Sequence, residues 1–493
     1  MTAPRPTRVV VAGGGTAGWL AATALVRQLG ALVDVTLVES DEIGTVGVGE
    51  STIPTTRSFH QFIGVDERAF VQATGATFKL GISFEGWGRE GERYFHPFGT
   101  LGRSVPIADF QHFWLEGRAQ GITAPLEDYS PEALAARQNR FGKTDSAPLA
   151  YAYHLDATAY ARFLRGIAEP AGVTRREGRI ERVERNGETG DIAALVLASG
   201  ERIEGDLFVD CTGFRALLSE GALGTRFEDW SAWLPTDRAF AVQSESAGPP
   251  PPYTRAIAHR AGWRWRIPLQ HRVGNGFVFA SAFMGEDEAR SVLLDALDAP
   301  PLFDPRLIRF RTGMRAEAWT HNCVALGLSA GFVEPLESTS IHLVMIAVMR
   351  LIQLFPFKRE SRALARRFNA QSRAEWEHVR DFIILHYHLN ARDEPFWRER
   401  RGRRVPDSLA ERIALFVERA AAHQDGEELF RVDSWVSVML GQGLVPAGHH
   451  RLASNLPRGA LEQSLAQLRA AVAAKVDVLP DHQRLLAELG AQR

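Results

Sequence analysis

Cysteine is almost absent from this chain of 493 residues, which contains only Cys211 and Cys323. Each lies in a short apolar run, and neither has a CxxC partner or a histidine at the spacing of metal ligands. The sequence therefore supports neither a disulfide framework nor a zinc site, and we expect no metal cofactor. This usage of cysteine is typical of a protein in a reducing, cytoplasmic compartment.

An excess of one charge and long hydrophobic runs are also lacking. The 57 basic and 59 acidic residues leave a formal net charge of −2, which gives no general attraction to nucleic acid. The most apolar stretch, residues 341–355, is interrupted by His342, Arg350 and Gln353 and is too short to span a bilayer. The N-terminal apolar run has only about five residues before its glycines, so it predicts a first strand rather than a signal peptide. We expect neither nucleic acid nor a membrane as a partner.

Lysine is scarce as well, with four examples among the 57 basic residues. One of them, Lys79, lies among apolar and aromatic neighbours that include Phe78, Leu80 and Phe84. Burial in such surroundings would lower the pKa of the amine and make it a nucleophile or a directed hydrogen-bond donor. The alternative is a lysine whose stem packs while its ammonium group reaches solvent. The local pattern favours a functional lysine.

A glycine motif is the clearest feature that is present. An apolar run over residues 9–12 is followed by Gly13-x-Gly15-x-x-Gly18 and then by an Ala- and Leu-rich helical pattern. Strand, glycine turn and helix in this order are typical of a dinucleotide-binding βαβ unit, in which the helix N-terminus faces the pyrophosphate. Thr16 and Ala17, inside the motif, are further candidates for contacts with the cofactor.

The choice between NAD and FAD depends on features farther along the chain. A second strand ends at Glu39, about 20 residues after the motif, where a carboxylate binds ribose hydroxyls in either class. Two later strand-and-turn segments, residues 202–214 and 321–335, indicate FAD, because such returns build the ribityl and pyrophosphate pocket of two-lobed FAD proteins. Residues 179–204 predict a small antiparallel insertion, in which Val183 either lines the adenine or packs on a surface meander.

Two tryptophans occur in the segment Trp263-x-Trp265-x-Ile267-Pro268. Indoles spaced by two lie on the same face of a strand and form a bulky wall, although core packing would explain them equally well. Together with the glycine motif, this segment resembles the flavin-dependent halogenases related to the tryptophan halogenases, and the resemblance extends over residues 9–446. In that family the tryptophan pair separates substrate from flavin. A single-component FAD-dependent aromatic hydroxylase, which shares the glycine motif, is the alternative.

The resemblance also implies two catalytic residues. Lys79 matches the essential lysine of the family, and Glu337 matches its glutamate, which would stabilise the cationic intermediate of the arene and accept its proton. Glu334 is the better candidate for an ordinary carboxylate at a helix N-terminus. Backbone amides of Thr339 and Ser340 would bind the halide, although Ser340 stands where the family usually has glycine.

Substrate and flavin contacts follow from the same resemblance. Residues 46–54 are similar to a glycine-rich strap that covers the flavin. His96, Phe98 and Trp435 would flank an aromatic ring, or else belong to the core. The remaining cofactor contacts implied by the resemblance are Glu50, Leu328 and Ile341.

The resemblance implies an FADH2-dependent halogenase that uses O2 and chloride or bromide to make hypohalous acid and halogenate an electron-rich, indole-like substrate. A separate NADH-dependent flavin reductase would supply the FADH2, and the family suggests a possible homodimer. We expect an α/β fold, with a Rossmann-like, two-layered flavin monooxygenase-type FAD domain over residues 1–345 and a helical C-terminal region over residues 346–493. The four prolines at residues 249–252 predict an extended surface connection.

Overall fold

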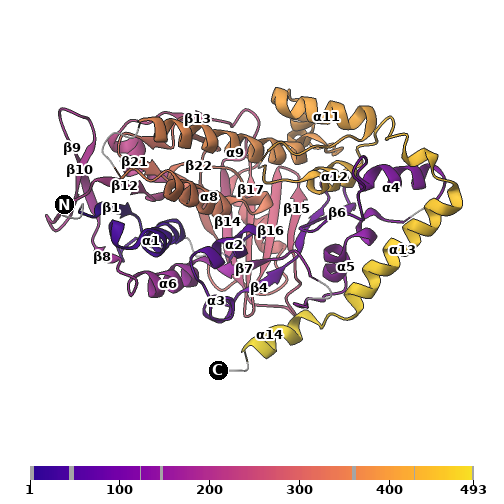
Figure 1. The fold of residues 1–493 in the computed structure, drawn as a ribbon, viewed down its shortest axis with the longest axis horizontal. Helices are drawn as coiled ribbons and strands as arrows, with labels where there is room; N and C mark the ends of the chain where they lie inside the picture. Colours follow the sequence, from indigo (N-terminus) through magenta and orange to yellow (C-terminus); the bar gives the residue numbers. More distant parts are fainter. Residues whose placement is uncertain are drawn as a thin grey trace. The chain divides into compact units, whose positions relative to one another are not determined.

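The computed structural model describes residues 5–43, 49–122, 124–144, 148–357, 362–426 and 428–490 (Figure 1). The chain divides into two compact units, each built from three separate segments. The first unit comprises Met1–Ala76, Leu155–Asp237 and Arg309–Glu377. The second unit comprises Thr77–His154, Arg238–Ile308 and His378–Arg493.

The first unit contains a six-stranded sheet in the order β20-β21-β12-β1-β2-β8. Its neighbouring strands are parallel, except that β20 runs antiparallel to β21. Parallel strands are covered on both faces, which explains why β1 is an almost continuous valine run. The bounds are β1 (Thr7–Ala12), β2 (Val33–Glu39), β8 (Thr174–Glu177), β12 (Leu207–Asp210), β20 (Trp319–Thr320) and β21 (Cys323–Ala325).

Helix α1 (Thr16–Leu29) connects β1 to β2 and packs against α6 and α8, so the predicted strand, glycine turn and helix are confirmed. Ala and Leu on its inner face are buried, as its apolar pattern predicts. The other helices that lie wholly in the first unit are α2 (Thr55–Phe62), α3 (Glu67–Thr74), α6 (Ala157–Ala168) and α8 (Ser340–Gln353). Helix α9 (Arg362–His388) begins in the first unit and ends in the second.

The remaining strands that lie wholly in this unit form two smaller sheets, apart from the short β3 (Gly49–Ser51). The antiparallel insertion expected over residues 179–204 is present as β9, β10 and β11, and Val183 packs on its apolar cluster. The first of the two sheets consists of β9 (Ile180–Arg185), β10 (Ile192–Leu197) and β11 (Arg202–Glu204). The second consists of β13 (Phe227–Asp229), β19 (Gly313–Arg315) and β22 (Gly331–Phe332).

The second unit contains a seven-stranded sheet in the order β18-β14-β17-β16-β15-β5-β6, whose pink central strands β14 to β17 run side by side in Figure 1. A short strand, β4 (Thr77–Lys79), pairs antiparallel with β7 (Ala152–Asp156). The sheet consists of β5 (Gly81–Glu85), β6 (Arg93–Pro97), β14 (Arg238–Ser244), β15 (Thr254–His259), β16 (Gly262–Pro268), β17 (Val273–Phe279) and β18 (Arg306–Arg309).

The helices of the second unit come mainly from the C-terminal part of the chain. Helix α13 packs against α4 and α5, and Figure 1 shows it in yellow beside these two. Their bounds are α4 (Phe110–Ala119), α5 (Pro131–Arg137), α7 (Glu286–Asp295), α10 (Pro395–Gly402), α11 (Asp407–Arg419), α12 (Val432–Gly441), α13 (Arg458–Asp477) and α14 (His482–Gly490).

The fold class predicted from the sequence is confirmed: a mixed α/β protein with a parallel nucleotide-binding-type sheet and a helical C-terminal region. Within the described ranges, no strand follows β22. The expected division at residue 345 falls inside α8, whereas each compact unit takes segments from distant parts of the chain. A core over residues 1–345 with a separate C-terminal region therefore stays a prediction.

Candidate active site

The glycine turn between β1 and α1 is crowded on one side and open on the other. Gly13 has φ +108°, and a Cβ there would lie 2.2 Å from the Cys211 carbonyl oxygen. A Cβ on Gly18 would lie 1.8 Å from the carbonyl oxygen of Gly13. At Gly15, by contrast, an added Cβ would have no described neighbour within 4 Å, so this residue leaves open space at the start of α1. The turn therefore fits a pyrophosphate that approaches the backbone at Gly15.

Glu39 ends β2 beside this turn, as expected for a ribose-binding carboxylate. Its Oε1 accepts a hydrogen bond from Arg175 Nε at 2.6 Å, and its Oε2 accepts one from Trp19 Nε1 at 3.3 Å. The carboxylate is so close to the turn that a Cβ on Gly14 would overlap it. The roles of Arg175 and Trp19 and the requirement for glycine at position 14 were not predicted from the sequence. The run of glycines was the one available signal.

The two late turns that favoured FAD meet each other in the first unit. Buried Asp210 accepts hydrogen bonds from the hydroxyl groups of Ser219 at 2.8 Å and Ser329 at 3.1 Å. The same Ser329 hydroxyl lies 3.1 Å from the Gly213 carbonyl oxygen, the alternative acceptor for its single proton. Asp210 therefore connects the turn after β12 to the turn after β21, and its carboxylate has a structural role.

The turn after β21 also meets the starts of α1 and α8. A Cβ on Gly327, which has φ +60°, would lie 3.0 Å from Ala17 Cβ and 3.4 Å from Val344 Cγ2. Leu328, the next residue, is 38% exposed, so its side chain is available to a ligand. Ile341 lies one turn before Val344 on α8. The first unit thus brings the elements that carry Ala17, Leu328 and Ile341 together.

Glu50 lies on β3 and is half-buried. Burial raises the pKa of its carboxyl group to about 7. The predicted strap, residues 46–54, is described only from Gly49 onward, and residues 46–48 lie outside the described residues. The role of Glu50 in binding flavin stays a prediction.

The segment before α8 carries three buried side chains, two of which belong to the predicted site. Glu334, Glu337 and Thr339 are each at most 1% exposed. Glu334 Oε1 accepts a hydrogen bond from Thr236 Oγ1 at 2.5 Å, so Glu334 has a structural partner inside the first unit. Ser340 is the first residue of α8, and the N-terminus of a helix favours an anion. A halide site at the backbone of Thr339 and Ser340 stays a prediction.

His342, which the sequence analysis did not assign to the site, holds the first turn of α8. Its Nδ1 lies 2.9 Å from Thr55 Oγ1, the first residue of α2. Burial, and secondarily the charge of Arg350, lower the pKa of His342 to about 4, so the ring is neutral at pH 7. Arg350 donates from Nη2 to Glu375 Oε2 at 3.0 Å. This network has no local sequence signal, because its members come from three helices.

Lys79 is fully buried in the second unit, as its apolar neighbours predicted. Its Nζ lies 4.9 Å from the centroid of the Phe98 ring. Phe98 is therefore a cation–π partner of the lysine in addition to its predicted place beside a substrate. Both residues belong to the unit that carries the tryptophan pair, whereas Glu337 belongs to the unit that carries the glycine turn.

His96 and Trp435 both lie against the ring of Phe382. The His96 ring centroid is 5.7 Å from that of Phe382, and the Trp435 centroid is 4.9 Å from the same ring. Phe382 and Phe430 stack with centroids 3.7 Å apart. The structure thus brings the two predicted substrate residues into one aromatic cluster, to which Phe382 and Phe430 are additions that sequence reasoning missed. Trp435 is 2% exposed, and among the described atoms its Nε1 has no hydrogen-bond partner.

The tryptophan pair lies on one face of β16, as its spacing predicted. The ring centroids of Trp263 and Trp265 are 6.1 Å apart, and both side chains are buried. Gly276 is opposite Trp265 on β17, and a Cβ there would lie 2.0 Å from Trp265 Cζ2. A glycine on the neighbouring strand therefore makes room for the indole.

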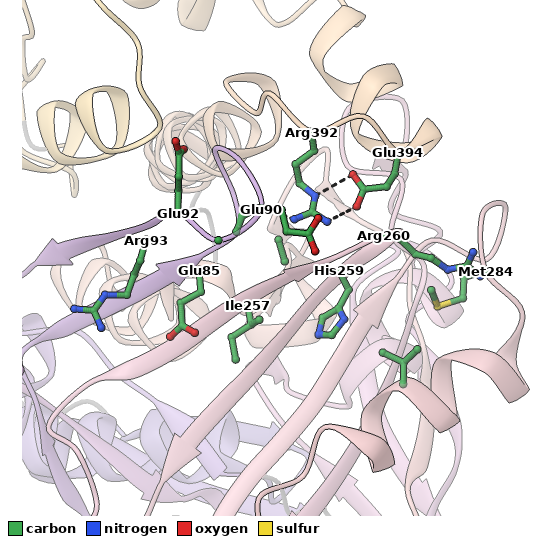
Figure 2. A pocket seen from close by; sticks show the side chains of 14 residues that line it. Glu85, Glu90, Glu92, Arg93, Ile257, His259, Arg260, Met284, Arg392 and Glu394 are labelled. Atoms are coloured by element: carbon green, nitrogen blue, oxygen red, sulfur yellow. Dashed lines mark hydrogen bonds and ion pairs between the residues drawn. The ribbon is translucent and has the colours of Figure 1, made fainter.

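A cavity of about 610 Å³ lies in the second unit and has none of the predicted site residues in its lining. Figure 2 shows Arg392 paired with Glu394 at its edge. Glu85 is likewise held by Arg255, with Nε 2.7 Å from Oε1. Burial, and then the charges of Arg264 and Arg392, lower the pKa of His259 to about 4. These charges compensate one another, and we assign no ligand to this cavity.

In the part of the chain that the structure describes, no group of three or more His, Cys, Asp or Glu is placed to hold a metal ion. No described helix has both the length and the apolar character needed to cross a membrane.

Known proteins share this fold over nearly their whole length. The flavin-dependent halogenase Xcc4156 from Xanthomonas campestris is 50% identical, with a TM-score of 0.97 and coverage of 99% of both chains. BrvH, a flavin-dependent halogenase from Brevundimonas sp. BAL3, is 45% identical, with a TM-score of 0.95 and coverage of 99% of this chain and 100% of that one. Tryptophan 6-halogenase SttH from Streptomyces toxytricini is 36% identical over 99% of both proteins.

The fold, the glycine turn and these relatives define a flavin-dependent halogenase, an enzyme class that implies a flavin and a halide. Residues 8–458 match the family described as tryptophan halogenase. The chain belongs to the tryptophan halogenase family.

Proposed function

We propose that this chain is an FADH2-dependent halogenase that uses O2 and chloride or bromide to halogenate an electron-rich, indole-like arene through Lys79 and Glu337. The observation that carries the proposal is the complete burial of Lys79 with its Nζ over the Phe98 ring. A buried ammonium group held against an aromatic face is a directed donor rather than a solvated surface charge. Its unit also supplies the aromatic cluster around His96 and Trp435.

The first unit supplies the cofactor end of the proposal. The open backbone at Gly15 and the N-terminus of α1 would hold the pyrophosphate, and Glu39 would hold the ribose. Bound reduced flavin, with O2, supplies the oxidising equivalents that convert halide to hypohalous acid. The amides of Thr339 and Ser340 would bind the halide at the start of α8.

The arene end of the proposal depends on four side chains. The wall of Trp263 and Trp265 keeps the arene apart from the flavin, so a small oxidant reaches it instead. Lys79 donates a hydrogen bond to hypohalous acid and directs its halogen at the ring. Glu337 stabilises the cationic arene and accepts the proton that leaves the halogenated carbon. We further propose a separate NADH-dependent flavin reductase as the source of FADH2, a cytoplasmic location and a possible homodimer.

Mass spectrometry of products tests the proposal. Indole and tryptophan are supplied separately with FAD, a flavin reductase, NADH and either chloride or bromide. We expect a chlorine or bromine isotope pattern that is lost in Lys79→Met, which keeps an unbranched side chain of similar length. A product that gains one oxygen and no halogen would instead indicate the hydroxylase alternative. Full halogenation by Lys79→Met would refute the assigned role of the lysine.

A further inference from the structure

The strand that carries Lys79 has only three residues, so the backbone ladder alone holds it weakly. In its pairing with β7, Thr77 is opposite His154 and Lys79 is opposite Ala152. Side chains alternate along a strand, so Thr77, Lys79 and His154 lie on one face. A slip of one residue would turn Lys79 to the other face. Ties beyond the ladder must therefore fix the register of β4.

The first tie passes through the hydroxyl group of Thr77. Its Oγ1 donates to the Pro268 carbonyl oxygen at 2.7 Å and lies 2.9 Å from His154 Nδ1. Because a carbonyl oxygen can only accept, the single hydroxyl proton of Thr77 goes to Pro268. Thr77 Oγ1 must then accept from a proton on His154 Nδ1. Pro268 ends β16, so this tie also joins the lysine strand to the strand of the tryptophan pair.

The protonation of Nε2 on the same imidazole is also determined. His154 Nε2 lies 2.9 Å from Thr254 Oγ1. Burial, followed by the charges of Lys79 and His482, holds the pKa of His154 well below its ordinary value, so the ring is neutral. With the proton on Nδ1, Nε2 is an acceptor and Thr254 donates to it. The opposite tautomer would lose the bond to Thr77, because neither Nδ1 nor Thr77 Oγ1 would then have a proton to share.

The second tie comes from the C-terminal helix α14. Phe78 donates its backbone N–H to His482 Nε2 at 3.3 Å, and His482 Nδ1 lies 2.8 Å from the Pro250 carbonyl oxygen. This carbonyl requires a donor, so His482 also carries its proton on Nδ1. His482 is fully buried, and burial lowers its pKa to about 4. The segment is docked locally, since Phe141 N–H donates to the Pro480 carbonyl oxygen at 3.1 Å.

The proline run at residues 249–252 takes part in this arrangement. Besides the contact of Pro250, the Pro252 carbonyl oxygen accepts from Leu80 N–H at 2.8 Å. Pro250 and Pro252 are buried, so the expected surface connection is wrong at these two residues. Prolines have no N–H and an extended backbone, and these two present carbonyl acceptors, Pro252 to Leu80 directly after β4 and Pro250 to His482.

We propose that His154 and His482 are positioning residues that hold Lys79 in its working place, the first through the Thr77 side chain and the second through the backbone of Phe78. The proposal rests on the proposed function of Lys79. Neither histidine is required to touch substrate or oxidant. Their common property is a neutral ring with the proton on Nδ1, which supplies one donor and one acceptor to otherwise unconnected segments.

Variants that remove or keep this donor and acceptor test the proposal. We expect His154→Phe and His482→Phe each to lower kcat for the halogenated product by about 10- to 100-fold, with KM for arene and halide changed by less than about twofold. The product formed per O2 consumed should fall as well, because the oxidant is made but not delivered. His154→Gln and His482→Gln should keep most of the activity that the Phe variants lose. Thr77→Ser should likewise keep most of the activity, whereas Thr77→Val should not.

A matched control separates positioning from general instability. His60 is also buried, and its Nε2 lies 2.7 Å from the Tyr160 hydroxyl oxygen in the first unit. We expect His60→Phe to lower the melting temperature without changing the product formed per O2. A readout without turnover is the 15N spectrum of the imidazoles, assigned by the Gln variants, in which His154 and His482 should show protonated Nδ1 and bare Nε2.

Two results would overturn the positioning roles while leaving the function of Lys79 intact. One is a protonated Nε2 in both rings at pH 7. The other is unchanged kcat and unchanged product per O2 in folded His154→Phe and His482→Phe, measured beside an inactive Lys79→Met. An active Lys79→Met would overturn both proposals and is recognised by that single variant.

Discussion

The ammonium group of Lys79 lies 4.9 Å from the centroid of the Phe98 ring. Phe98 is held by its backbone N–H, which donates to the Leu80 carbonyl oxygen at 3.0 Å, directly after β4. A cation on a ring face is stabilised by about 0.5–2 kcal/mol, more when both groups are desolvated. Phe98 therefore restrains the lysine.

Replacement of the Phe98 ring should slow the halogenation of the arene by the oxidant. We expect Phe98→Leu to lower kcat for halogenation by about 3- to 30-fold, which corresponds to the loss of a cation–π contact. Phe98→Tyr keeps a ring and should retain most activity. Steady-state kinetics with saturating halide measure both variants. Equal activity in Phe98→Leu and the parent protein would show that the contact does not contribute.

Alanine substitutions at two glycines of the turn should impair the protein in different ways. Gly13→Ala is expected to destabilise the apoprotein, because φ +108° is strained for alanine and its Cβ would overlap the Cys211 carbonyl group. Gly15→Ala has open space, so the apoprotein should keep its melting temperature while its affinity for FAD falls by about tenfold or more. Thermal denaturation without flavin and fluorescence titration with FAD separate the two effects. Unchanged FAD affinity in Gly15→Ala would place the pyrophosphate elsewhere.

The contact between Gly276 and Trp265 predicts a coupled pair of substitutions. Gly276→Ala should cost about 1–3 kcal/mol of unfolding free energy, because its Cβ would lie 2.0 Å from Trp265 Cζ2. Trp265→Leu on the same background should recover much of that cost, since the ring that obstructs the methyl group is gone. Urea denaturation of the two single variants and the double variant measures the coupling. Simple additivity would mean that the indole moves aside freely.

Buried neutral histidines predict how stability depends on pH. Burial lowers the pKa of His60 and of His342 to about 4. In the unfolded chain each titrates near its ordinary pKa of about 6.5, so between these two values the unfolded state binds more protons than the folded state. Stability should therefore be complete above about pH 6.5 and should fall as the pH decreases toward 4.

The comparison of melting temperatures at pH 7.5 and pH 5 measures this effect. His60→Gln and His342→Gln should each reduce the difference between the melting temperatures at pH 7.5 and pH 5, although each lowers the melting temperature at pH 7.5. His321→Gln is the surface control, because the His321 side chain is 38% exposed. If the melting temperature of His60→Gln and of His342→Gln depends on pH as steeply as that of the parent protein, these histidines are not the buried neutral groups assigned here.

Features encoded within one short stretch were predictable from the sequence. The glycine turn follows from positive φ and close backbone approach, and the common face of Trp263 and Trp265 follows from the twofold repeat of a strand. The burial of Lys79 followed from its apolar neighbours in the same way. The α/β class and the helical C-terminal region followed from the spacing of apolar residues.

The contacts between distant segments were decided only by the tertiary structure. Phe382 and Phe430 reach His96 from other parts of the chain, and Arg175 reaches Glu39 across 136 positions. Thr77 meets Pro268 across 191 positions and His154 across 77. Periodicity tells which face of an element is buried, but it does not tell which side chain will lie opposite. A hydrogen bond between two such side chains depends on the register and packing of whole strands and helices, which is why the sequence identified Lys79 but not the histidines that hold it.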